Sequence, residues 1–380
     1  MRAYLEESNQ DLLYQIAVVQ ELLGKTIVCG ELTPYVGQVI QLCEALRRQA
    51  QRNLTDLGYG LDDTLNDILA ATQSLSNVFE VVNTRLAAPV VRARPEDRLG
   101  LLVLRFLHDS NPKTASLPFA LSDGSFAIYP TDKIPPIYLI PTSRQTTLLY
   151  LPLLFHEFGH LLYACHKAEM DELVKDFQKI VAGALAPKSV RSRAGASRSS
   201  SFRKQVVTAW YTWGQEFYCD AVGITVGGPC FLKAFSHFFR TRSNDQYYVP
   251  RDEQLKRRHP VTWLRTKMLA DRARTYGLHT LADGIQDVWA ETARVLAIQE
   301  DYEGTWSEEF FQPLRQMLDD MIEESQPYAH QPTDVILPAG SEKPLSPVHL
   351  CNVAWSKFES DGKGYRAWEK DAIDSFLRGT

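Results

Sequence analysis

The chain has 380 residues, of which 44% are hydrophobic and 23% are charged, and its formal net charge is −5 at pH 7. This composition is typical of a globular protein large enough for two domains, and the acidic balance gives no reason to expect a nucleic-acid partner. The 6 cysteines show no C-x-x-C spacing. Reduced thiols in a cytoplasmic protein are therefore expected rather than a disulfide framework.

Residues 1–94 are expected to be helical. The sequence turns acidic at Glu6-Glu7 with no apolar stretch behind it, which argues against a secretory signal. Apolar residues then recur at helical spacing, and Thr33-Pro34 predicts the start of a new helix. The apolar stripes either pack on one another and on the rest of the protein, or form a docking surface for a protein partner.

Residues 95–270 are expected to form the core. Two short strands, 117–121 and 126–129, flank a predicted hairpin turn at 122–124, and 137–140 follows as another strand. An edge strand of this small sheet can hold an extended peptide by main-chain hydrogen bonds. The alternative is a sheet that only covers the helix after it.

The segment 148–165 contains the pattern His156-Glu157-x-x-His160 in an otherwise apolar helix. Histidines at i and i+4 lie on one helical face and can bind one metal ion, which places Glu157 beside that ion. The expected metal is zinc, with three protein ligands and an open position for water. The segment is shorter than the about 20 residues that cross a bilayer and carries Pro152, so no integral membrane span is predicted.

A third zinc ligand is expected from residues 206–226. Glu216 and Asp220 lie one helical turn apart among aromatic residues. Glu216 can be the third ligand, while Asp220 can accept the outward N–H of a ligand histidine. The preceding residues, about 186–203, are rich in Ser, Ala and Arg without apolar periodicity, which predicts a mobile loop.

His259-Pro260 and Arg265 are further candidates for catalysis. An imidazole or a guanidinium near the scissile carbonyl would stabilise the developing oxyanion. The alternatives are a histidine that merely starts a helix and an arginine that pairs with a buried acid.

The order of these motifs resembles the gluzincin zinc metallopeptidases, and within them the group of the CAAX prenyl proteases and bacterial heat-shock membrane proteases. The resemblance covers about residues 137–268. It implies that His156, His160 and Glu216 are zinc ligands and that Glu157 is the general base and acid. Asp220 would be a carboxylate that contacts a ligand, and His259 and Arg265 would flank the substrate. Members of that group carry transmembrane helices, and none is predicted here. Gln215 also replaces the Asn that precedes the ligand in thermolysin-like relatives.

The sequence therefore predicts a mainly α-helical protein with a small β-sheet (α+β), whose gluzincin-like core lies between helical regions 1–94 and 271–380. The helices expected toward the C-terminus are 261–276, 281–298, 306–324, 347–358 and 365–378. The predicted function is a zinc-dependent endopeptidase acting on a protein or peptide substrate, including the case of a protease selective for one cytoplasmic partner. The alternative is a non-catalytic or regulatory zinc-containing helical platform in a larger assembly.

Overall fold

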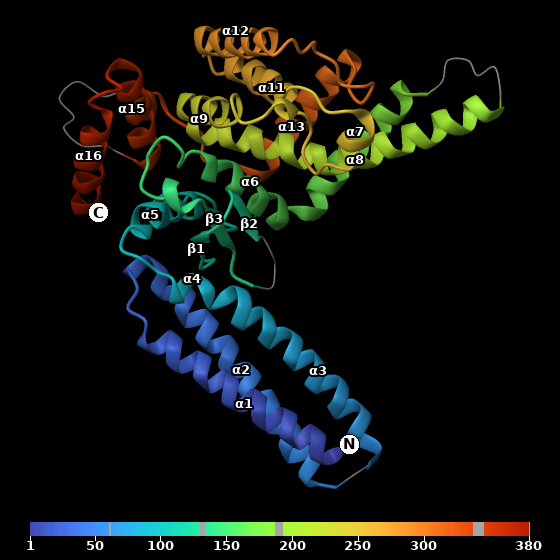
Figure 1. The fold of residues 1–380 in the computed structure, drawn as a ribbon, viewed down its shortest axis with the longest axis vertical. Coiled ribbons are helices and arrows are strands. Elements are labelled where there is room, and N and C mark those ends of the chain that lie inside the picture. The colour runs from blue at the N-terminus through green and yellow to red at the C-terminus, as the bar shows by residue number, and fades with distance from the viewer. Residues whose placement is uncertain (61, 130–133, 187–192, 337–345, 380) are drawn as a thin grey trace. The chain divides into compact units, whose positions relative to one another are not determined.

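The computed structural model describes residues 1–60, 62–129, 134–186, 193–336 and 346–379. It is mostly helical with one small sheet (Figure 1), which confirms the predicted mainly α class. None of the helices within these ranges combines the length and the apolarity that a bilayer crossing requires.

The chain divides into two compact units. The first contains residues 1–105 and 117–146, and the second contains residues 106–116 and 147–380. This division differs from the three predicted segments. The small sheet belongs to the same unit as the N-terminal helices, and the C-terminal helices belong to the same unit as the two motif histidines.

Three long helices dominate the first unit and run side by side in Figure 1: α1 (Arg2–Lys25), α2 (Thr33–Gly58) and α3 (Leu65–Val81). α2 begins at Thr33-Pro34, as predicted. The helices bury apolar residues such as Leu5 and Leu57 between them, so these parts of the stripes form a core. A buried polar pair crosses this core, where the Asn53 amide donates to Asn9 Oδ1 over 3.0 Å.

Shorter elements complete the first unit. They are the 3₁₀ turns Gly30–Leu32, Asp62–Thr64 and Thr142–Arg144, the π-helical turn Val82–Leu86, α4 (Ala88–Val91) and the first part of α5 (Asp97–Asp109).

The sheet of the first unit contains β1 (Ala120–Asp123), β2 (Ala127–Tyr129) and β3 (Ile137–Ile140) in the order β1-β3-β2. β1 pairs with β3 in parallel and β2 pairs with β3 in antiparallel orientation, so the predicted hairpin between the first two strands is wrong. The reason lies in the contacts of the expected turn. The Gly124 N–H donates to the Ile140 carbonyl over 3.1 Å, and Asp123 accepts a hydrogen bond from Gln145, which keep this segment along β3.

The second unit is helical. Its helices are α6 (Leu153–Cys165), α7 (Lys167–Ala184), α8 (Arg193–Gly227), α9 (Pro229–Phe239), α10 (Arg251–Gln254), α11 (Thr262–Thr275), α12 (His279–Val295), α13 (Phe311–Ser325), α14 (Pro332–Val335), α15 (Pro347–Ser360) and α16 (Tyr365–Gly379), with 3₁₀ turns at Asn244–Gln246 and Glu308–Phe310. Helices α11, α12, α13, α15 and α16 confirm the five helices predicted toward the C-terminus.

Helix α8 corrects the predicted loop at residues 186–203. Residues 187–192 lie outside the described part of the chain, but the helix has already begun at Arg193. Ala, Arg and Ser are compatible with a helix, and this stretch continues into a part of α8 that is held by the buried rings of Trp210 and Trp213. α8 ends at Gly227, where Gly228 follows with a φ of 56°.

Candidate metal centre

Helix α6 presents His156, Glu157 and His160 from an apolar surrounding. Its neighbouring Leu and Phe residues are buried, which fixes the helix within the second unit. His156 and Glu157 are themselves buried, with Glu157 only 6% exposed, and His160 is partly exposed. Buried ionisable side chains of this kind require partners, because leaving them unpaired is costly.

The partners come from α8, which crosses α6 at very short range. A Cβ atom on Gly159 would lie only 2.8 Å from the Cα of Cys219, so only glycine allows the two backbones to approach this closely. The contact lies inside the H-E-x-x-H motif and brings Glu216, one turn earlier in α8, to the two histidines.

The distances between these side chains fit a metal site. His156 Nε2 lies 3.4 Å from Glu216 Oε2, and His160 Nε2 lies 3.6 Å from Glu216 Oε1. Nitrogen and oxygen ligands that bind one tetrahedral ion at about 2.0–2.1 Å are separated by about 3.3 Å. In addition, Glu216 Oε2 is buried and accepts no hydrogen bond within the described structure. The carboxylate therefore points an unsatisfied oxygen at the place where a cation would bind.

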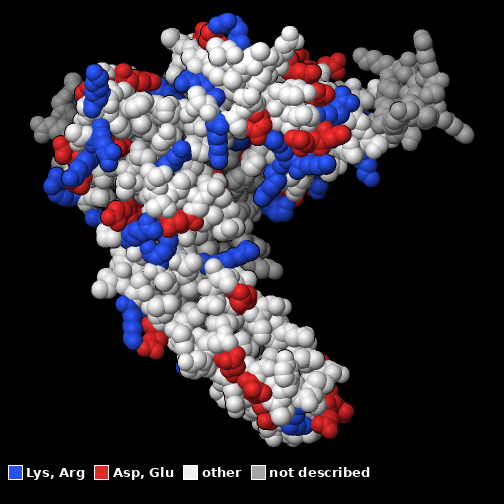
Figure 2. All heavy atoms as spheres, in the orientation of Figure 1, with Lys and Arg blue, Asp and Glu red and all other residues white. Residues whose placement is uncertain are grey.

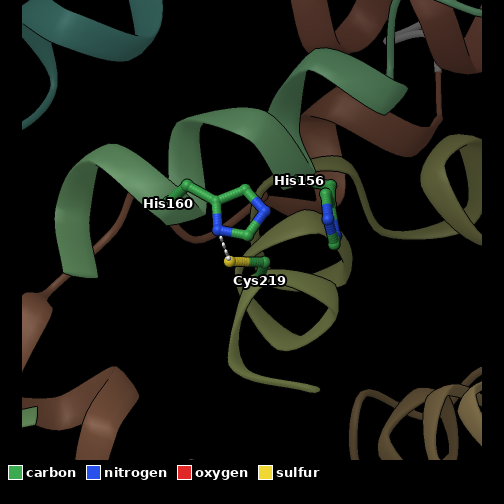
Figure 3. Close-up of side chains that lie close together, drawn as sticks. All are labelled: His156, His160 and Cys219. Carbon is green, nitrogen blue, oxygen red and sulfur yellow. Dashed lines mark hydrogen bonds between the residues drawn. The ribbon is translucent and has the colours of Figure 1, made fainter. Parts of the chain in front are cut away.

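Cys219 is a residue that the sequence interpretation missed. Figure 3 shows its sulfur beside the ring of His160, where Sγ lies 3.2 Å from Nδ1. His156, His160 and Cys219 form a group whose ligand atoms lie within 4.8 Å of one another and could hold a metal ion. Its position next to Asp220 and one helical turn after Glu216 is the only signal in the sequence that could have drawn attention to it.

Asp220 and Arg265 fix the orientation of His156. His156 Nδ1 donates to Asp220 Oδ1 over 2.9 Å. Arg265 donates two hydrogen bonds to the same carboxylate, from Nε over 2.7 Å and from Nη2 over 2.8 Å. Because Nδ1 is engaged, Nε2 is the nitrogen of His156 that remains for a metal. Asp220 thus contacts the outward nitrogen of one motif histidine, and Arg265 lies where its alternative interpretation placed it, as the partner of a buried acid.

The ionisation of the site follows from burial and close charges. Burial raises the pKa of Glu157 to about 7 and lowers the pKa of His160 to about 4. Burial also disfavours the protonated form of His156 and would lower its pKa. The contacts of His156 with Asp220 and Glu216 outweigh burial and raise this pKa to about 10. Burial would also raise the pKa of Glu216, yet the neighbouring histidines hold it far below its usual value.

The site has an excess of negative charge when its carboxylates are ionised and its histidines neutral, as metal ligands must be. Glu157, Glu216 and Asp220 are buried carboxylates, and Arg265 is the guanidinium that pairs with Glu216 and Asp220 among the described residues. With both histidines neutral, two negative charges remain, which one divalent cation would neutralise.

His259 marks the solvent side of the site. Its Nε2 lies 3.3 Å from Glu216 Oε2, although 57% of its side chain is exposed. A molecule approaching from solvent would meet this imidazole beside the carboxylate. The structure thus brings together all seven residues proposed from the sequence.

Comparison of the chain with protein-family models, with curated proteins and with solved structures gives no match in any of the three. The interpretation of the site therefore depends on its residues and geometry.

Proposed function

We propose that the chain is a zinc-dependent endopeptidase. The observation that carries the proposal is the convergence of His156 Nε2 and His160 Nε2 on the two oxygens of Glu216, at 3.4 and 3.6 Å. Two imidazoles and one carboxylate form the ligand set of catalytic zinc sites that keep a fourth position open for water. Zinc is the proposed ion because H-E-x-x-H on a helix, with a carboxylate as third ligand, is the ligand set of zinc peptidases.

Glu157 is the proposed general base and acid. A bound zinc ion would polarise the scissile carbonyl and acidify water. Glu157 follows the first ligand in α6, and its pKa of about 7 lets it both accept a proton and return it near neutral pH. The buried environment that raises this pKa also keeps bulk solvent away from the carboxylate.

The remaining residues orient these groups. Asp220 holds His156 by its Nδ1–H, and Arg265 holds Asp220 by two hydrogen bonds. His259 lies at the exposed edge of the site, where its ring can donate a hydrogen bond to the carbonyl oxygen of a substrate. Arg265 is 4% exposed and engaged with Asp220, so we assign it to positioning rather than to direct contact with the substrate.

The second candidate is a non-catalytic zinc site with Cys219 as the third ligand, in a helical platform for a larger assembly. The short contact between Cys219 Sγ and His160 Nδ1 favours it. Two facts weigh against it. His156 offers only Nε2, which faces Glu216, and burial raises the pKa of Cys219 well above its ordinary value, which disfavours the thiolate.

Zinc content by elemental analysis separates the two candidates. We expect about one zinc per chain in the wild type, loss of zinc in Glu216→Ala, and retention in Cys219→Ala. The reverse pattern would establish the cysteine-ligated site. Zinc-loaded Glu157→Gln should then retain its metal and bind, without cleaving, substrates that the wild type hydrolyses; cleavage by this variant would refute the role of Glu157.

A further inference from the structure

A cavity of about 630 Å³ lies in the second unit beside the proposed active site. One wall is formed by residues 204–212 of α8, and the other by residues 252–258, which begin within α10 and continue beyond it. The side chains in its lining that carry positive charge or a hydroxyl group are Lys204, Thr208, Thr212, Lys256, Arg257 and Arg258. Its volume falls within the range of about 300–1,000 Å³ that is typical of ligand pockets.

The cavity is strongly basic. Lys204, Lys256 and Arg258 are exposed and make no ion pair among the described residues, while Arg257 pairs with Asp245 over 2.8 Å. Asp252 is the single carboxylate in the lining. In the view of Figure 2, basic and acidic side chains are interspersed, and the chain as a whole has a net charge of −5. With Arg257 paired to Asp245, three unpaired cations against one acid remain among the described residues of the lining, which is a local departure from the mixed charges elsewhere.

Both walls of the cavity lead directly to the metal centre. Thr212 precedes Glu216 by about one turn of α8. On the other wall, Arg258 is followed by His259, whose Nε2 lies 3.3 Å from Glu216 Oε2. The buried Trp213 joins the two walls, because its Nε1 donates to the Arg257 carbonyl over 3.1 Å. A chain bound in the cavity would thus lie close to the proposed catalytic residues.

We propose that this cavity binds an acidic segment of the polypeptide substrate, adjacent to the bond that is cleaved; the proposal rests on the proposed peptidase function. Lys and Arg side chains with free charge bind carboxylates, and the hydroxyls of Thr208 and Thr212 can donate to a peptide backbone. A single-stranded nucleic acid is less suited, because the described residues that line the cavity include no aromatic ring on which bases could stack.

The test is fluorescence anisotropy with the Glu157→Gln variant as receptor. The probes are a fluorescein-labelled peptide of alternating Glu and Ala and the same peptide with Gln in place of Glu. We expect the acidic peptide to bind more tightly, with an affinity that falls as salt is added. Adding Lys204→Glu, Lys256→Glu and Arg258→Glu together should raise its Kd about tenfold, because exposed ion pairs each contribute modestly and reversal adds repulsion.

The control carries the same change in net charge elsewhere in the second unit, as Lys175→Glu, Lys363→Glu and Lys370→Glu, which are exposed cations outside the cavity. An equal loss of affinity in the control, or no preference for Glu over Gln, would overturn the proposal. Tighter binding of a labelled oligothymidylate than of the acidic peptide would also overturn it. The binding readout needs no turnover, so a failure of the peptidase proposal would show separately, in zinc content and in cleavage by the wild type.

Discussion

Replacing Glu157 by Gln should make the metal-stripped protein more stable at alkaline pH. Burial raises the pKa of Glu157 from 4.5 to about 7. A carboxyl with a higher pKa in the folded than in the unfolded state favours folding while it is protonated. Its contribution is lost as the pH rises through the window from 4.5 to about 7, where the unfolded state releases its proton first. At about 1.4 kcal/mol per pKa unit, the loss reaches about 3 kcal/mol above this window. Gln is uncharged at every pH and avoids this loss.

The assay is urea unfolding of the chelator-treated wild type and the variant at about pH 5 and about pH 8. We expect the two free energies of unfolding to differ by about 1 kcal/mol or less at the lower pH and by about 3 kcal/mol in favour of Gln at the higher pH. His156 and His160 titrate in both proteins, so their contributions largely cancel in the difference. A difference that is the same at both pH values would refute the reasoning, because it would show that Glu157 ionises normally in the folded protein.

Three further substitutions test the residues that hold the site in its geometry. Asp220→Asn should weaken zinc affinity about 10- to 100-fold in competition with a chelating dye, because the ligand histidine loses its ionised acceptor; unchanged affinity would contradict that role. Arg265→Met should lower the free energy of unfolding by about 3–5 kcal/mol, since the buried carboxylate loses its guanidinium; a loss below 1 kcal/mol would show that Asp220 does not depend on Arg265. Gly159→Ala should destabilise by about 1–3 kcal/mol through its clash with Cys219, whereas Gly183→Ala, with open space around it, serves as control.

The residues of the site could be predicted from the sequence because their spacing reports helical geometry. His156 and His160 lie one turn apart, as do Glu216 and Asp220, and the structure places both pairs on helices. What spacing cannot report is the approach of one helix to another. Cys219 lies beside His160 because Gly159 permits backbone contact between α6 and α8, a feature of the packed structure that neither helix shows alone.

The errors have physical causes as well. The order of the three strands depends on which backbone groups pair over a distance in the chain, and a turn-forming sequence such as Asp123-Gly124 predicts only local reversal. For residues 193–203, polar composition predicted a loop, but helix α8 extends through them. Composition describes how exposed a segment is and does not exclude a helix whose other end is anchored in the core.

The charges of the buried carboxylates explain why metal binding to this site should release protons. Three buried carboxylates facing one guanidinium carry two excess negative charges. Protonation of His156, with its pKa of about 10, and of Glu157, with its pKa of about 7, would offset both. Zinc binding requires the proton on His156 Nε2 to leave. At about pH 8, where Glu157 is mostly ionised, we therefore expect at least one proton released per zinc bound, measured by calorimetry in buffers of different ionisation enthalpy. Release of no proton would mean that His156 is already neutral, and that Asp220 and Glu216 do not stabilise its charged form.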